Sequence, residues 1–338
     1  MFLRYLKTFF SIVTIYFFMC IFVNIIVDPY NELGRNKIGL YYSTERQAKK
    51  EILKYEHDAI LIGSSRTRTT PPEKLLGYKF YNASFPLIVP EEIYYFLKKY
   101  VWKEKLVVIG LDFEMFNETV LPFREMDQWN DRQFGLMEYV MGFNVFHDSI
   151  GSLYKKYVLK EGPLIAQDGH YVKQDIVNAE VAGIRNMFST AKVIDPQKGM
   201  INPKELQEIQ EILGGVVSPG YRGSMAFLAS HHFRRFVFSK KRMDYLMRIK
   251  KSLDERGIKC IVFVGPYNED VLAMMQRKGY MEMFEEWKKE LRSIFVNFYD
   301  ESCCQYSGRS NFGATDPQHY RPEVGVEFLN KILNDHEK

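Results

Sequence analysis

The chain has 338 residues and 46% of them are hydrophobic, which gives room for one large domain or two ordinary ones around a sizeable core. Its formal net charge is only +4, too small a surplus for this length to predict a nucleic-acid partner. The four cysteines include the adjacent pair Cys303 and Cys304 and show neither a disulfide framework nor a zinc-ligand spacing. We therefore expect no metal and no cofactor.

The first segment of the chain is apolar. Between Lys7 and Asp28 lie twenty residues without a charge, TFFSIVTIYFFMCIFVNIIV. As a helix they would span about 30 Å, the thickness of a bilayer's hydrocarbon core. A cleaved signal peptide is the alternative, but the residues VDPYNELG that end and follow the run offer no small-x-small cleavage site. The sequence therefore predicts an uncleaved transmembrane anchor over residues 1–27.

The charges beside this anchor do not fix its orientation. Arg4 and Lys7 precede it, and Arg35, Lys37 and Arg46 follow it, so the excess of positive charge on cytoplasmic loops does not distinguish the two orientations. A large domain after an N-terminal anchor usually crosses the membrane. We therefore expect a single-pass protein of the cell membrane with an extracytoplasmic domain.

After a polar linker over residues 28–50, which leads into a short helix, apolar runs alternate with helical patterns. The runs are bounded by Gly, Pro, Asn or Asp, which is typical of strands buried on both faces of a parallel sheet. They are Ala59–Ile62, Phe80–Ala83, Leu106–Leu111, Cys260–Val264 and Phe295–Tyr299.

The segments between the runs have helical patterns. Pro and two acidic residues open the first of them, as expected for the first turn of a helix. The expected helices cover 90–104, 239–256, 281–294 and 322–334. This alternation predicts an α/β three-layer sandwich over residues 51–338, with a central, mostly parallel sheet and right-handed crossovers.

Residues 116–238 interrupt the alternation. They combine helical patches such as PKELQEIQEIL with Gly- and Pro-containing loops. We interpret them as a large, mainly helical insertion on the sheet, because insertions at the carboxyl ends of strands often shape a binding cleft. Within it, we interpret His231 and His232, which precede Phe-Arg-Arg, as a solvated basic helix face.

Two short motifs at opposite ends of the domain carry candidate chemistry. Ser64 and Ser65 follow the first expected strand, where ligands bind in open α/β sheets, but a small polar strand end is by itself more often structural. Asp316 and His319 lie three apart in an expected turn after the last strand, so the carboxylate can hold one ring nitrogen while the other faces a serine. Because both motifs can meet at one edge of a doubly wound sheet, together they indicate an activated serine.

The sequence resembles the SGNH hydrolase superfamily in four blocks that follow successive expected strands. The blocks are GSS at 63–65, NAS at 82–84, GLDF at 110–113 and DPQH at 316–319. It looks most like membrane-anchored bacterial members that act on envelope polymers, such as alginate O-acetyltransferase proteins and the D-alanyl transfer protein of the teichoic-acid system. The resemblance implies a flavodoxin-like sandwich and a serine acyl-ester hydrolase or O-acyltransferase acting on a cell-envelope polysaccharide through an acyl-enzyme. Transfer would further imply an integral-membrane acyltransferase as partner.

The resemblance implies a role for each matching position. Ser65 would be the nucleophile, and its backbone N–H would be one oxyanion donor. His319 would be the general base, and Asp316 would orient it. Two positions depart from the family. Leu87 aligns with a glycine whose N–H serves the oxyanion hole, and we do not expect a leucine to reach the same dihedrals. Asp112 takes the place of an asparagine donor. An ionised Asp cannot donate, and the loss of one such donor lowers the rate by about 10²–10³-fold.

Arg66 offers a repair for the second departure. If it pairs with Asp112, the negative charge is neutralised and the guanidinium could itself face the oxyanion. The alternative is that Arg66 and Arg68 are ordinary solvated loop charges.

Two other classes of protein stay open. Leu87 and Asp112 favour a catalytically inactive glycan-binding or scaffold component of an envelope polymer export or modification complex. An ordinary α/β ligand-binding domain would make the pairing of the GSS and DPQH motifs a coincidence.

Overall fold

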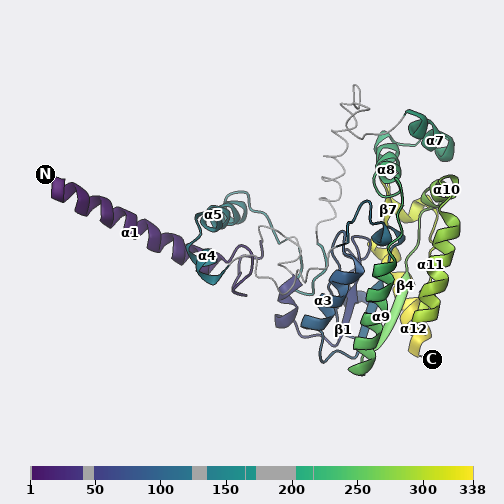
Figure 1. Ribbon diagram of the computed structural model, residues 1–338, viewed down its shortest axis with the longest axis horizontal. Helices are drawn as coiled ribbons and strands as arrows, with labels where there is room; N and C mark the ends of the chain where they lie inside the picture. The colour runs from purple at the N-terminus through teal and green to yellow at the C-terminus, as the bar shows by residue number, and fades with distance from the viewer. Residues whose placement is uncertain are drawn as a thin grey trace.

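The computed structural model describes residues 2–40, 49–123, 135–163, 165–172, 203–215 and 217–337. Their centre is a five-stranded sheet with the strand order β2-β1-β3-β4-β5, in which every neighbouring pair is parallel (Figure 1). The strands are β1 Ala59–Ile62, β2 Phe80–Asn82, β3 Leu106–Gly110, β4 Lys259–Val264 and β5 Phe298–Asp300. The predicted α/β class and parallel sheet are therefore confirmed.

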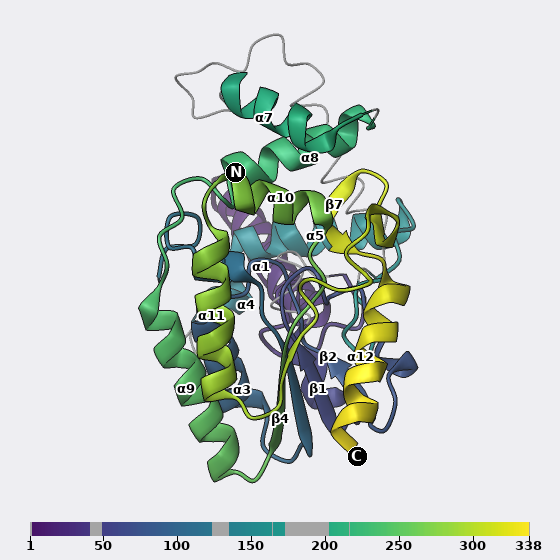
Figure 2. The same ribbon diagram turned by 90° about the vertical axis from the view of Figure 1, so that its right-hand side faces the viewer.

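The sheet has helices on both faces because the side chains of its strands alternate between two hydrophobic clusters. Ile60 and Ile62 pack in the cluster that contains α3, α9 and α11. Ala59 and Leu61 pack in the second cluster, with α12 (Figure 2). Complete burial of such side chains contributes about 1.5–3 kcal/mol each. The helices of these layers, with α10 beside them, are α3 Pro90–Tyr100, α9 Lys240–Glu255, α10 Glu269–Arg277, α11 Met281–Ile294 and α12 Pro322–Glu337.

The strand order places a topological switch point between β1 and β3. The chain leaves β1 toward β2 on one side and returns to β3 on the other side of β1. Ile62 pairs with Ile109, so the loops that follow these two strands emerge side by side. This is the position at which open α/β sheets bind ligands, and it holds the GSS and GLDF blocks.

Two elements differ most from the sequence prediction, and α3 also ends at Tyr100, four residues before its expected end. The fifth strand begins at Phe298, because α11 continues to Ile294 and the N–H of Phe295 still bonds to the carbonyl of Leu291. The DPQH block is not in a turn: it forms β7, Asp316–Tyr320, which pairs with β6, Phe312–Gly313, in a small antiparallel ribbon.

The first helix, α1 (Phe2–Val27), is long and apolar enough to cross a membrane. The polar segment after it is folded rather than extended: the carboxylate of Asp28 accepts the N–H groups of Leu33 and Arg35 and the hydroxyl of Tyr139. The expected short helix is the 3₁₀ turn η1, Lys50–Lys54. Part of the segment, 41–48, lies outside the described residues.

The segment 116–238 leaves and re-enters the domain at one point, because Asn117 and Phe238 form an antiparallel bridge. Of this segment, 124–134, 164, 173–202 and 216 lie outside the described residues. The helices α4 and α5 pack against α1, away from the sheet, whereas α7 and α8 lie at the β7 end of the domain (Figures 1 and 2). Their bounds are α4 Leu136–Met141, α5 Phe143–Tyr157, α7 Pro203–Leu213 and α8 Pro219–Ser230.

Candidate active site

The loop after β1 presents one serine and buries the other. Ser64 and Arg66 are buried, whereas Ser65 between them is half-buried. The tight turn needs the glycine before it, since a Cβ at Gly63 would lie 2.6 Å from the Thr67 hydroxyl and 2.9 Å from the Gly110 carbonyl oxygen. The strand therefore ends in a turn that leaves only the Ser65 hydroxyl accessible.

The structure brings Ser65, His319 and Asp316 together in one hydrogen-bonded chain. The Oγ of Ser65 lies 2.8 Å from Nε2 of His319, although the two residues are 254 positions apart. The Nδ1 of the same ring lies 2.6 Å from Oδ2 of Asp316. This is the arrangement in which a carboxylate orients an imidazole and the imidazole takes the proton of a serine.

Asp316 is held ionised by its neighbours. Its Oδ1 accepts the backbone N–H groups of Gln318 at 2.9 Å and His319 at 3.2 Å. Burial alone would raise the pKa of this carboxyl, but the His319 ring and the two N–H donors outweigh burial and hold the pKa below its ordinary value. The carboxylate is therefore available as an acceptor for His319.

Contacts from α8 fix the β6–β7 ribbon that carries this pair. The hydroxyl of Ser224 donates to the carbonyl of Thr315 at 2.7 Å. On the other side, the Tyr320 ring packs edge-on against Phe328 of α12, at 5.3 Å between centroids. The ribbon is thus held between a helix of the 116–238 segment and the sheet domain.

The NAS block braces the loop that carries Ser65. The Asn82 side chain donates to the carbonyls of Thr67 and Thr70, both at 2.9 Å. The hydroxyl of Thr67 donates to that of Ser84 at 2.8 Å. This block therefore fixes the geometry of the loop.

Leu87 has the backbone conformation of a glycine. Its φ is +55°, in the left-handed region that favours glycine, and its side chain is 54% exposed. The position that we aligned with the glycine of the family thus keeps a glycine-like geometry despite its side chain, and it retains an N–H. A leucine therefore does adopt a left-handed conformation at this position.

Asp112 is paired with Arg66, as the sequence suggested. The Nη1 of Arg66 lies 3.0 Å from Oδ1 of Asp112, and the hydroxyl of Ser64 donates to Oδ2. The backbone N–H of Arg66 in turn donates to Oγ of Ser64 at 3.1 Å. The charge that stands in place of the asparagine donor is therefore neutralised, and the second serine serves this ion pair.

The interpretation of Arg66 and Arg68 as solvated loop charges is wrong. They are only 2% and 3% exposed. The Arg66 guanidinium lies 4.2 Å from the centre of the Tyr267 ring and donates to the Pro266 carbonyl, and that of Arg68 lies 4.5 Å from the centre of the Tyr171 ring. These interior partners of Arg66 do not support the idea that its guanidinium faces an oxyanion directly.

Two residues of this network escaped the sequence analysis. The hydroxyl of Tyr267 donates to Oε2 of Glu114 at 2.5 Å and accepts the N–H of Phe113 at 2.8 Å. Burial, followed by the nearby Asp112, raises the pKa of Glu114 to about 7, although Arg66 opposes the shift. A second acid two residues after Asp112 was the only signal in the sequence.

His232 is also buried, so its assignment to a solvated face is wrong, whereas His231 is exposed. Burial first, and then the nearby charges of His231 and His319, lower the pKa of His232 to about 4. It is therefore a neutral imidazole near His319, and in the described part of the chain its Nδ1 has no hydrogen-bond partner.

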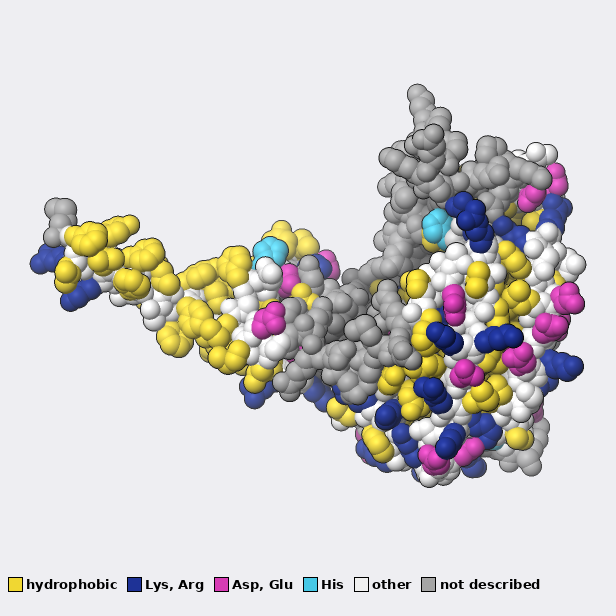
Figure 3. Space-filling view, viewed as in Figure 1, with side chains coloured by type: hydrophobic (Ala, Val, Ile, Leu, Met, Phe, Trp, Pro, Cys, Tyr) yellow, Lys and Arg dark blue, Asp and Glu magenta, His cyan; other side chains and the backbone are white. Residues whose placement is uncertain are grey.

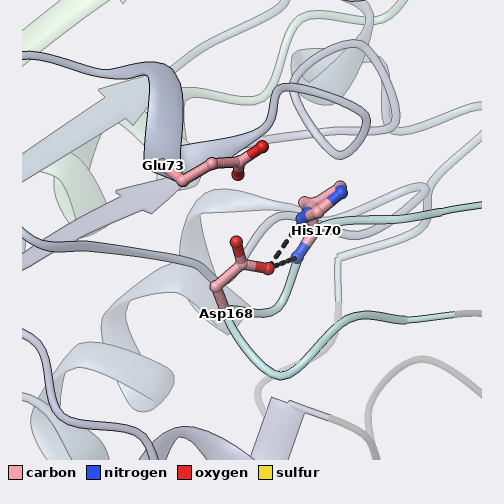
Figure 4. Close-up of side chains that lie close together, drawn as sticks. All are labelled: Glu73, Asp168 and His170. Carbon is pink, nitrogen blue, oxygen red and sulfur yellow. Dashed lines mark hydrogen bonds and ion pairs between the residues drawn. The ribbon is translucent and has the colours of Figure 1, made fainter.

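A further group of polar side chains lies beside the loop at 165–171. Glu73, Asp168 and His170 each place one potential ligand atom within 4.8 Å of the others (Figure 4). Oδ1 of Asp168 already bonds to Nδ1 of His170 at 2.6 Å, and the Asp168 carbonyl accepts the N–H of Asn82 at 2.8 Å. The backbone of Asp168 therefore ties this loop to β2.

No family model matches the chain. None of the curated proteins matches it either.

Proposed function

We propose that the protein is a membrane-anchored serine acyl-ester hydrolase or O-acyltransferase of the SGNH type that acts on a cell-envelope polysaccharide. The observation that carries the proposal is the continuous chain from the Ser65 hydroxyl through His319 to Asp316, with links of 2.8 and 2.6 Å. An accessible serine with a base and an orienting carboxylate is the usual arrangement for acyl transfer.

In the proposed reaction, Ser65 Oγ attacks the carbonyl carbon of an ester while Nε2 of His319 takes its proton. The tetrahedral intermediate collapses as His319 returns this proton to the leaving alcohol, which gives an acyl-Ser65 enzyme. His319 then deprotonates either water or a sugar hydroxyl, which attacks the acyl-enzyme and frees Ser65. Water makes the protein an esterase, and a sugar hydroxyl makes it a transferase.

The N–H groups of Ser65 and Leu87 would stabilise the oxyanion in this reaction. Asp112 supplies no donor, but its pairing with Arg66 removes the repulsion that a free carboxylate would exert on the developing charge. The chemistry needs no metal and no cofactor.

The length and apolar character of α1 support a single-pass anchor in the cell membrane. We place the sheet domain on the extracytoplasmic side, because a large domain after an N-terminal anchor usually crosses the membrane. If the protein is a transferase, the acyl group has to cross this membrane. An integral-membrane acyltransferase would then be its partner.

The second candidate is a glycan-binding or scaffold component that has kept the fold and lost catalysis. Asp112, which cannot donate to an oxyanion, favours it. Against it stands the hydrogen-bonded chain of Ser65, His319 and Asp316, which a protein without turnover does not need.

The test uses the full chain in detergent with p-nitrophenyl acetate as acyl donor, with and without soluble envelope oligosaccharides. An esterase or transferase releases nitrophenol at a rate that Ser65→Ala abolishes. If it is a transferase, the oligosaccharide also gains one acetyl mass. Binding of oligosaccharide without turnover in either assay would favour the scaffold.

A further inference from the structure

A large hollow lies between the end of α1 and the sheet domain. It has a volume of about 1150 Å³. Ile25 and Ile26 of α1 form one side, and Pro163, Ile165 and Ala166 form part of another. The hollow is therefore bounded by the last turn of the proposed membrane anchor.

The charged side chains among its described lining residues are all basic. Arg35, Lys37, Lys54 and Lys156 line it, and no acidic side chain occurs among the described lining residues. Arg35, Lys37 and Lys156 form no ion pair with any residue that the structure describes. Arg35, Lys37 and Lys156, which lack a counter-charge among the described residues, therefore form a site for an anion around the hollow.

The helix α5 connects this hollow with the middle of the anchor. Near its start, the rings of Phe143 and Phe146 lie 6.5 and 5.8 Å from that of Tyr16. Tyr16 precedes the end of α1 by about 16 Å of helix, roughly half the thickness of the hydrocarbon core. Lys156 of the hollow lies about 20 Å further along α5. If α1 spans the bilayer, α5 runs from the acyl chains to the headgroups.

The outer surface of α4 and α5 fits this placement. Figure 3 shows hydrophobic side chains continuing from α1 over this region, with acidic and histidine side chains between them. Met137 and Phe143 are 68% and 62% exposed, although they are large and apolar. Tyr154 and Tyr157, which are also exposed, lie toward the other end of α5, where amphipathic rings mark a membrane–water interface.

We propose that this hollow binds the phosphate headgroup of an anionic phospholipid, whose acyl chains lie along α4, α5 and α1. This deepens the proposed function, since it rests on α1 being a membrane anchor. The lipid would fix the height of the sheet domain above the bilayer. It would do so without taking part in the chemistry of Ser65.

The test uses the full chain reconstituted in vesicles that contain photoreactive phosphatidylglycerol or phosphatidylcholine, each with a diazirine at the end of its acyl chain. Labelled peptides are mapped by mass spectrometry. We expect labelling of α1 by both lipids and of 136–159 mainly by phosphatidylglycerol. Each basic side chain near the membrane surface contributes about a fivefold preference for an anionic lipid. The double variant Lys37→Gln, Lys156→Gln should therefore reduce the ratio of phosphatidylglycerol to phosphatidylcholine labelling of 136–159 roughly tenfold or more. The matched control, Lys240→Gln with Lys289→Gln on α9 and α11, should leave this labelling ratio unchanged.

Equal labelling of 136–159 by both lipids, or a preference that survives the change of Lys37 and Lys156, would overturn the proposal. Protection of 136–159 from labelling in native membranes but not in vesicles would also overturn it, because a protein would then cover this surface. A second arm adds soluble glycerol phosphate to vesicles of phosphatidylcholine alone. If glycerol phosphate binds saturably there with an affinity like that of the lipid, and if the Lys37→Gln, Lys156→Gln variant loses this binding, the hollow is a site for soluble phosphate compounds instead.

The same experiment separates the failure of the lipid site from that of the anchor. Label in α1 without label in 136–159 overturns the lipid site and leaves the anchor intact. No label in α1 overturns both the lipid site and the anchor. The reactivity of Ser65 is measured in a separate experiment and does not depend on this result.

Discussion

The guanidinium of Arg66, the residue that follows the candidate nucleophile, lies 3.0 Å from the carboxylate of Asp112, and both residues are buried. The pair stands where the SGNH blocks lead one to expect a neutral asparagine. A buried charge that loses its partner is costly, typically by about 3–5 kcal/mol, whereas removal of both charges is often nearly neutral.

Arg66→Gln should therefore lower the free energy of unfolding by about 3–5 kcal/mol, because it leaves Asp112 charged and unpaired. It should also lower kcat/KM by about 10²–10³-fold, because the free carboxylate then repels the oxyanion. The double variant Arg66→Gln, Asp112→Asn should recover most of the stability. Denaturant titration and ester hydrolysis of the wild type and the two variants measure both effects. Equal losses of stability and of kcat/KM in the single and double variants would show that the Arg66–Asp112 ion pair is not the cause.

Glu114 gives the protein a stability that depends on pH. Its pKa is raised from 4.5 in the unfolded chain to about 7 in the folded one, so the folded state holds its proton more tightly. This contribution is complete below pH 4.5 and is lost as the pH rises through 7; it amounts to at most about 3 kcal/mol. Between these values, Glu114→Gln should flatten the dependence of Tm on pH. An unchanged slope in this variant would show that Glu114 is not the group responsible.

Asp316 acts in the opposite direction. Its pKa is lowered on folding, so the stability that it contributes is present above its unfolded pKa and is lost as the pH falls through the folded value. Asp316→Asn should remove this loss of stability at acid pH. We expect the Tm of the variant to fall less below about pH 4 than that of the wild type. At neutral pH the same variant should lower kcat by about 10⁴-fold, through loss of the orientation of His319.

Leu87→Gly tests whether the backbone at this position matters more than the side chain. The left-handed conformation costs a leucine about 1–2 kcal/mol, which glycine avoids, and the N–H is kept. We expect kcat within about threefold of the wild type and a free energy of unfolding equal or slightly higher. The matched control is Leu76→Gly, another exposed leucine but without a positive φ, which should destabilise the protein. A large loss of activity in Leu87→Gly would indicate that the side chain itself contacts the substrate.

Asn24 should hold α4 against the anchor. It is completely buried, and its side chain donates to the carbonyls of Val140 at 3.0 Å and Gly142 at 3.1 Å. Asn24→Leu removes these bonds from an apolar environment, where they are not replaced by water. We expect limited proteolysis of the full chain in detergent to cut near Gly142 several times faster in this variant. The control Thr14→Leu, in the same helix, should not change the rate.

Local pattern sufficed for the sheet and for the triad. The runs of β1, β3 and β4 are buried on both faces, so nearly every residue in them is apolar, and this is visible without a structure. The pairing of the serines after β1 with Asp316 and His319 could be expected because the ends of parallel strands meet at one edge, whereas the choice of Ser65 rested on the resemblance to the SGNH blocks. The chain has no comparable local signal for which of the two serines points outward.

The burial of the arginines could not be predicted, because charge normally indicates exposure. Arg66 is stabilised inside by Asp112 and Tyr267, which lie 46 and 201 positions away in the sequence. The conformation of Leu87 was equally hidden, since a leucine gives no sign of a positive φ. The packing of α4 and α5 on α1 also depends on partners more than a hundred positions apart, such as Asn24 and Gly142.

The proposed function requires Ser65 to be an activated nucleophile. The most direct measurement is the intact mass of the full chain in detergent after exposure to a fluorophosphonate, for the wild type and for Ser64→Ala, Ser65→Ala and His319→Ala. We expect a single adduct in the wild type and in Ser64→Ala, none in Ser65→Ala, and a strongly slowed reaction in His319→Ala. A folded wild-type protein that forms no adduct, or one whose adduct persists in Ser65→Ala, would contradict this role of Ser65.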